Sequence, residues 1–91
     1  MPVFTTANLT RIKTYTILVG ATYVTSAGAR GIDMLYYGTV DGVTFTGIFT
    51  GSIPIALPPS IPYTLEYNDK GYDEITIENN GDADVYIVEK F

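Results

Sequence analysis

The sequence contains no cysteine and no histidine. Disulfide bonds, thiolate nucleophiles, haem ligation and zinc sites built from nitrogen and sulfur ligands are therefore excluded. Serine and cysteine triads are excluded as well, because the chain has no imidazole to act as the general base. We therefore expect a protein without a cofactor, and the composition gives no reason to expect an enzyme.

Positive charge is scarce. The chain has 5 Lys and Arg against 10 Asp and Glu, which gives a net charge of −5. Nucleic acid is not an expected partner, because binding to phosphates requires clustered basic side chains. Hydrophobic residues make up 46% of the 91 residues, which is too apolar for a disordered chain and fits one small folded domain.

A hydrophobic run long enough to cross a membrane is also missing. Arg11 and Lys13 precede an apolar stretch at residues 15–24, a layout that resembles a signal peptide. Interspersed threonines make this stretch too polar for that purpose. We interpret it as a β-strand and expect no membrane partner.

Thr, Ile, Val, Tyr and Phe dominate what is present, and 9 glycines and 5 prolines interrupt them. No window of ten or more residues has helical periodicity, so the pattern predicts an all-β protein. The expected fold is a small antiparallel β-sandwich or partly closed barrel, of jelly-roll or immunoglobulin-like type, over residues 11–91. Residues 1–10 are expected to form an N-terminal arm. The predicted strands lie at 12–19, 21–25, 32–40, 43–50, 63–67, 73–78 and 82–89.

Asp41-Gly42 predicts a two-residue β-hairpin turn, because both positions of a type I′ turn need positive φ. This turn would place four pairs of residues on one face of the hairpin. The predicted pairs are Val40 with Val43, Gly38 with Phe45, Tyr36 with Gly47, and Met34 with Phe49.

Asn79-Asn80-Gly81 predicts a second hairpin, with a three-residue loop. In this register Ile77 faces Ala83 and Ile75 faces Val85, which keeps the apolar side chains on one face. A register shifted by one residue would turn them toward water.

Four prolines between residues 53 and 62 exclude a central strand and a helix. Apolar residues alternate with these prolines. We therefore expect an extended segment that crosses between the two sheets of the sandwich.

Glu78, Asp82 and Asp84 would share one face of the second hairpin. Paired carboxylates can cleave glycosides, but these lie at an exposed turn where nothing would raise the pKa of one of them. A solvated acidic surface is the simpler interpretation, and a weak calcium site is the alternative. We expect neither a catalytic site nor a strong metal site.

Tyrosine is frequent, with 8 residues. We expect Tyr37, Tyr72 and Tyr86 to lie at an interface, because tyrosine supplies area and a polar tip at small entropic cost. A stacking platform for sugars, or plain β-propensity, would also account for them. Val3, Phe4 and Leu9 precede the first predicted strand, where an internal partner is hard to assign. We expect these three to contact a neighbouring chain.

The segment YYGTVDGVTFTG, the proline-rich crossover and the segment DEITIENNGDADVYIVEKF together resemble small β-sandwich proteins of tailed bacteriophage particles. These include capsid decoration (cement) proteins and small tail or fibre modules. The resemblance implies a non-enzymatic virion protein that forms a homo-oligomer, most often a trimer. It also implies that this protein clamps neighbouring major capsid subunits at the capsid surface. The alternative function is a carbohydrate- or receptor-binding module of a viral fibre or a cell surface.

Overall fold

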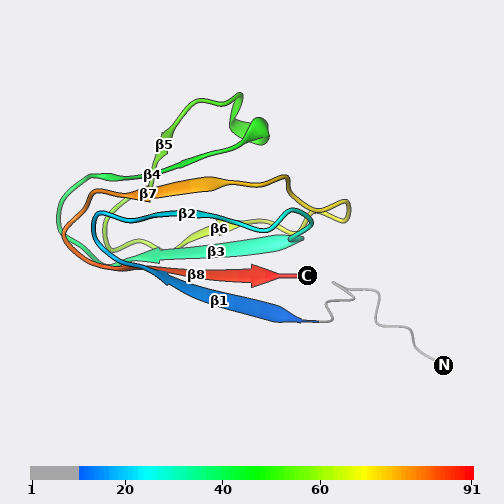
Figure 1. The fold of residues 1–91 in the computed structure, drawn as a ribbon, viewed down its shortest axis with the longest axis horizontal. Helices are drawn as coiled ribbons and strands as arrows, with labels where there is room; N and C mark the ends of the chain where they lie inside the picture. The colour runs from blue at the N-terminus through cyan, green and yellow to red at the C-terminus, as the bar shows by residue number, and fades with distance from the viewer. Residues whose placement is uncertain (1–10) are drawn as a thin grey trace.

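The computed structural model describes residues 11–91 as two antiparallel four-stranded sheets with the core between them (Figure 1). The first sheet has the order β1-β8-β3-β6. Its strands are β1 (Ile12–Ile17), β8 (Val85–Lys90), β3 (Gly31–Tyr36) and β6 (Tyr63–Leu65). The second sheet has the order β2-β7-β4-β5. Its strands are β2 (Thr22–Val24), β7 (Thr76–Asn79), β4 (Val43–Thr46) and β5 (Ile55–Ala56). The predicted all-β antiparallel sandwich is confirmed.

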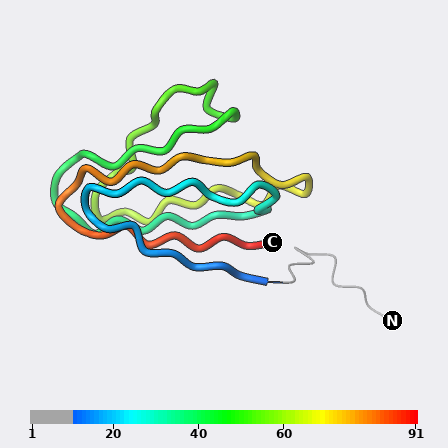
Figure 2. The backbone as a smooth tube through the Cα atoms, viewed as in Figure 1, coloured from blue at the N-terminus to red at the C-terminus, as the bar shows by residue number. Residues whose placement is uncertain are grey.

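The connections between the strands show which type of β-sandwich the chain forms. Every connection between consecutive strands except β4–β5 passes from one sheet to the other. Figure 2 shows the chain winding back and forth along the long axis, with the β1–β2, β3–β4 and β7–β8 connections at the same end. Eight strands wound in this way into two sheets of four form a jelly roll, one of the two fold types that the sequence left open.

Both predicted hairpins are wrong. Strand β3 pairs with β8 and β6, whereas β4 pairs with β7 and β5. The Asp41-Gly42 segment therefore joins strands of different sheets, and the segment 79–81 does the same between β7 and β8. The two connections instead lie against each other, because the Asn80 N–H donates a hydrogen bond of 2.9 Å to the Gly42 carbonyl.

The faces of the strands agree with the predicted alternation even though the pairs do not. In β3, β4, β7 and β8 alternate residues turn inward, and with Ile17, Leu65 and residues of the connections they make up the core. The buried apolar residues are Ile17, Ala29, Ile32, Met34, Tyr36, Val43, Phe45, Leu57, Leu65, Ile75, Ile77, Val85, Ile87 and Phe91.

The proline-rich segment crosses between the sheets as predicted. Strand β5 lies at the edge of one sheet and β6 at the edge of the other, and Leu57 between them is buried. The strand predicted at 43–50 is shorter, because a 3-10 turn, η1 (Ile48–Thr50), follows Gly47. This turn is the one helical element among the described residues. It ends at Gly51, whose φ of 71° is left-handed.

The predicted arm, residues 1–10, lies outside the described residues. Within residues 11–91, no helix has the length and the apolar character needed to cross a membrane.

Candidate functional site

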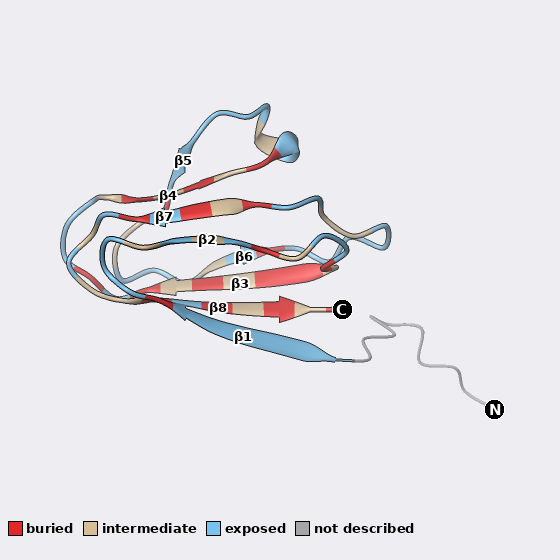
Figure 3. Cartoon of the chain, in the orientation of Figure 1, coloured by how far each residue is buried: buried red, intermediate tan, exposed pale blue. Residues whose placement is uncertain are grey.

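Large apolar side chains are exposed along the segment that joins β4 to β5 and at the first residue of β5. Ile48 is 70% exposed and Ile53 is 62% exposed, and Phe49 and Ile55 are exposed as well. We call these four residues the apolar loop. In Figure 3 this segment is mostly pale blue and stands away from the other strands. A patch of neighbouring exposed apolar side chains is typical of surfaces that dock on another molecule, so this segment is a candidate docking surface.

Internal contacts hold the apolar loop in place. The Thr50 side-chain oxygen lies 2.8 Å from the Gly47 carbonyl and 2.9 Å from the Ile53 carbonyl. It also accepts a hydrogen bond of 3.2 Å from the Gly47 N–H. The Phe49 ring lies 6.2 Å from the Phe45 ring and 5.6 Å from the Tyr72 ring, between centroids. The loop therefore presents its isoleucines on an ordered backbone.

The predicted interface tyrosines differ in their exposure. Tyr37 is 57% exposed and Tyr86 is 44% exposed, so both remain available to a partner. Tyr72 is half-buried against the core, and its hydroxyl donates a hydrogen bond of 2.5 Å to the Glu66 carbonyl. The other predicted interface residues, Val3, Phe4 and Leu9, lie outside the described residues.

The predicted acidic face is not a compact cluster. Glu78 is an exposed residue of β7 in one sheet, whereas Asp84 directly precedes β8 of the other sheet. In the described part of the chain, no three acidic side chains lie close enough together to hold a metal ion.

Asp82, the third of these carboxylates, connects two loops. Its side chain accepts hydrogen bonds from the Thr39 N–H at 2.8 Å and from the Thr39 hydroxyl at 2.5 Å. The Tyr36 hydroxyl lies 2.9 Å away. These hydrogen bonds, chiefly those from Thr39, lower the pKa of Asp82 to about 2. The ionised form of Asp82 therefore joins the β7–β8 connection to the β3–β4 connection.

Asp82→Asn should lower the midpoint of thermal unfolding at neutral pH, because it removes the charge that Thr39 contacts. The pKa of Asp82 is lower in the folded state, at about 2, so its contribution is present above an unfolded pKa of about 3.9. The contribution is lost as the pH falls toward 2. Calorimetry between pH 2 and 7 should show that the difference between wild type and variant shrinks with acid. Asp41→Asn, an exposed carboxylate of the β3–β4 connection, is the control and should melt like wild type. A constant difference across this pH range would contradict this role.

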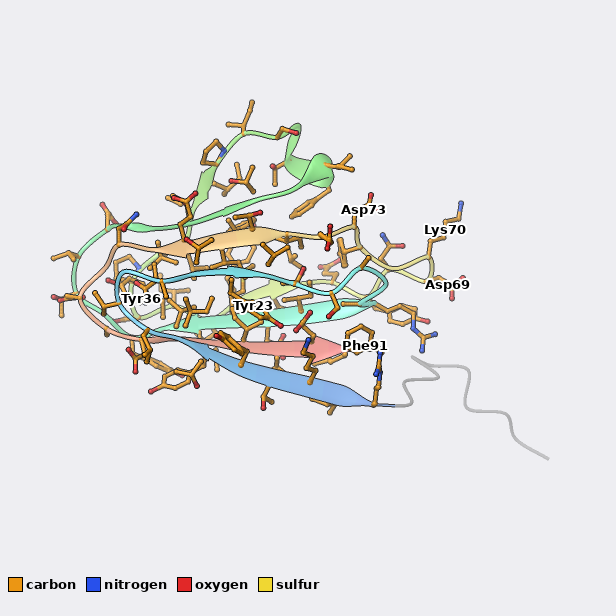
Figure 4. All side chains as sticks on the ribbon, viewed as in Figure 1. Tyr23, Tyr36, Asp69, Lys70, Asp73 and Phe91 are labelled. Carbon is orange, nitrogen blue, oxygen red and sulfur yellow. The ribbon has the colours of Figure 1, made fainter. Side chains whose placement is uncertain are left out.

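A carboxylate that the sequence analysis did not single out is fully buried. Glu89 lies on β8 at the inward position after Val85 and Ile87, and it is 0% exposed. Its Oε2 accepts a hydrogen bond of 2.6 Å from the Tyr23 hydroxyl, and its Oε1 accepts one of 2.8 Å from the Ser26 N–H. Tyr23 belongs to β2 of the opposite sheet, so this carboxylate joins the two layers. Figure 4 labels Tyr23 where it reaches from β2 toward β8.

Two residues on the inner face of β1, Tyr15 and Lys13, lie next to Tyr23. The Tyr15 ring stacks on the Tyr23 ring at 4.2 Å between centroids, and the Lys13 ammonium lies 6.0 Å from the Tyr23 ring. Lys13 also donates a hydrogen bond of 3.1 Å to the Ser26 hydroxyl. Burial, followed by the hydrogen bond and charge of Glu89, raises the pKa of Tyr23 well above its usual value.

This cluster lacks room for a ligand. Residues 11–91 form no pocket, and their buried side-chain polar atoms all have hydrogen-bond partners. Glu89 is enclosed, and both its oxygens accept hydrogen bonds from the protein. The arrangement therefore stabilises the contact between the two sheets.

No protein-family model matches the chain, and no curated protein matches it. Two solved structures are similar to it. A de novo designed double-stranded β-helix, solved by solution NMR, has a TM-score of 0.58 at 19% identity over 90% of this chain and 100% of that one. The crystal structure of PirA has a TM-score of 0.50 at 14% identity over 88% of this chain and 93% of that one. At such low identity the likeness shows the fold alone, in agreement with the jelly-roll winding.

Proposed function

We propose that this chain is a non-enzymatic structural protein of a virus particle. In this proposal it is a capsid decoration (cement) protein that self-associates and clamps neighbouring capsid subunits. The observation that carries the proposal is the apolar loop, whose exposed isoleucines are held on an ordered backbone. A preformed apolar surface favours docking, because an ordered surface loses less entropy on binding.

Two further features support this proposal. The buried carboxylate Glu89 is enclosed and hydrogen-bonded, so it is poorly placed to act on a substrate. A domain of 91 residues without disulfides has a small core, and burying surface against other chains is a common way to stabilise such a domain. The phage resemblance implies that this oligomer is a trimer.

A carbohydrate- or receptor-binding module is the alternative. It calls for solvent-facing aromatic rings along a groove. Tyr37 and Tyr86 are exposed, but residues 11–91 form no pocket. This alternative therefore has less support than docking through the apolar loop.

The proposal predicts that the chain is found in virus particles. Particles purified from cultures that carry the gene should contain the chain in a stoichiometric ratio to the major coat protein, as measured by mass spectrometry. Particles that lack the gene product should rupture at a lower temperature, and added purified protein should restore their stability. Absence from the particles would overturn the proposal.

The double variant Ile48→Ser/Ile53→Ser should reduce binding to such particles at least tenfold. Both side chains are exposed, so the melting temperature of the free protein should change little. Ile61→Ser is the matched control, because Ile61 is 57% exposed but lies in the β5–β6 connection. Co-sedimentation measures the binding. Equal loss of binding in Ile61→Ser would contradict a specific role of the apolar loop.

A further inference from the structure

The first sheet ends in β1, the longest edge strand among the described residues. The four edge strands of the sandwich are β1, β6, β2 and β5, with 6, 3, 3 and 2 residues. Among residues 11–91, β1 pairs only with β8, so one side of its backbone has no strand beside it. Such an edge is a template for another strand.

The hydrogen-bond pattern shows which groups of β1 face outward. The Phe91 N–H donates a bond of 3.0 Å to the Arg11 carbonyl, so residues 11 and 91 form a hydrogen-bonded pair. Such pairs alternate along an antiparallel ladder, so Lys13, Tyr15 and Ile17 also direct their backbone groups toward β8. The N–H and carbonyl groups of residues 12, 14 and 16 therefore point away from the sheet.

The strand has few of the features that usually block an exposed edge. It contains no proline, and its ladder with β8 runs over six residues without a bulge. The side chains on its outer face, Ile12, Thr14 and Thr16, are exposed, uncharged and β-branched, which favours strand pairing. Lys13 is the one charged residue of β1, and its side chain lies on the inner face near Tyr23.

We propose that β1 pairs antiparallel with β1 of a second copy of this chain, about a two-fold axis at Thr14. Thr14 then faces Thr14 of the second copy, and Ile12 faces Thr16 of the second copy. These are the residues whose backbone groups point outward, so the contact forms about six main-chain hydrogen bonds. The result is one continuous eight-stranded sheet shared by two chains.

The same register places the charged residue opposite an aromatic ring of the second copy. Lys13 of one copy lies opposite Tyr15 of the other, and the two-fold axis repeats this contact. A lysine ammonium is attracted to the face of a tyrosine ring. Tyr15 already stacks on Tyr23 within its own chain, so its ring is held in place to receive that charge. An inward-facing lysine usually prevents strand addition, but in this pairing it meets an electron-rich ring.

A second copy fits this edge better than the other edges of the fold do. Strand β6, the opposite edge of the same sheet, has 3 residues and directly follows Pro62. It therefore offers few main-chain groups, and proline commonly protects such an edge. Among the edge strands within residues 11–91, β1 alone has six residues, so a second copy of β1 is the edge strand that matches its length. This inference rests on the self-association in the proposed function and specifies its contact.

Charged residues introduced at Thr14 test the two-fold axis. Sedimentation equilibrium on the full chain should give about twice the chain mass of 9.9 kDa for wild type and for Thr14→Val. Thr14→Glu alone and Thr14→Lys alone should each be monomeric, because like charges then face each other across the axis. An equimolar mixture of the two variants should recover the doubled mass. Thr14→Pro should be monomeric yet folded, because it removes only an outward-facing N–H.

Three results would overturn the β1 contact. These are a monomeric wild type, an oligomer that Thr14→Glu and Thr14→Pro leave intact, and a mixture of the charged variants that stays monomeric. An oligomer insensitive to Thr14 would show that another surface carries the self-association, such as a trimer contact or pairing through β6. Particle binding that persists in Thr14→Pro would leave the proposed function standing, so the two failures can be told apart.

Discussion

We expect Tyr23→Phe to lower the free energy of unfolding by about 2–3 kcal/mol, although it removes a single oxygen atom. The Tyr23 hydroxyl donates a hydrogen bond of 2.6 Å to Glu89, which is fully buried. Without it, one oxygen of a buried carboxylate loses its partner and cannot reach water instead. The cost of leaving such a group unsatisfied exceeds the net value of an ordinary hydrogen bond. Urea unfolding monitored by circular dichroism measures the change.

A double-mutant cycle separates this effect from a loss of packing. Glu89→Leu removes the carboxylate, so in that background Tyr23→Phe should cost far less than in wild type. Tyr86→Phe is the control, because Tyr86 is an exposed tyrosine of the same strand as Glu89 and should behave like wild type. Additive effects of the Tyr23 and Glu89 substitutions would show that the two side chains do not act as a pair.

The same pair determines how stability changes in alkali. Because burial and Glu89 raise the pKa of Tyr23, the folded state holds the phenol proton more tightly than the unfolded state does. This contribution is complete below the unfolded pKa of about 10 and is lost as the pH rises above it. Wild type should therefore lose stability above pH 10 more steeply than Tyr23→Phe does.

The sequence contains a local signal for the position of Glu89 but none for its partners. A residue two places after Ile87 in a strand faces the same side, so Glu89 is expected to turn inward. Tyr23 and Ser26, however, lie 66 and 63 residues away along the chain. Only the winding of the two sheets brings β2 and β8 to opposite sides of the core. No spacing rule reveals a pair of that kind.

The two turns illustrate the same limit of local patterns. Alternation predicted the inward-facing residues inside the strands, because the period of a strand does not depend on its partner. It was wrong for Val40 and Phe49, which it assigned to the same face but which lie beyond the strand ends and are exposed. It did not predict the pairing. A turn between two strands of one sheet and an arch between two sheets use the same glycine-containing segments and the same alternation. Here both segments are arches, and the strands they join lie in different layers.

The packing of one arch on the other predicts that Gly42→Ala is severely destabilising, by about 3 kcal/mol or more. Gly42 has a φ of 150°, which disfavours any side chain. A Cβ added there would also meet the backbone carbonyl of Asn80 at less than van der Waals distance. Backbone cannot move aside as the end of a flexible side chain can. The hydrogen bond between the Asn80 N–H and the Gly42 carbonyl would be strained as well.

Gly20→Ala is the matched control, because it separates backbone strain from the clash. Gly20 has a φ of 86° in the β1–β2 connection, at the same end of the sandwich, but an added Cβ would meet nothing within 4 Å. It should therefore cost only about 1 kcal/mol, the strain of a left-handed alanine. If Gly42 lay in the turn of an isolated hairpin, Gly42→Ala would add only backbone strain, as Gly20→Ala does. The two variants would then unfold at similar denaturant concentrations. If urea unfolding gives equal losses for both, the two arches do not pack on each other as described.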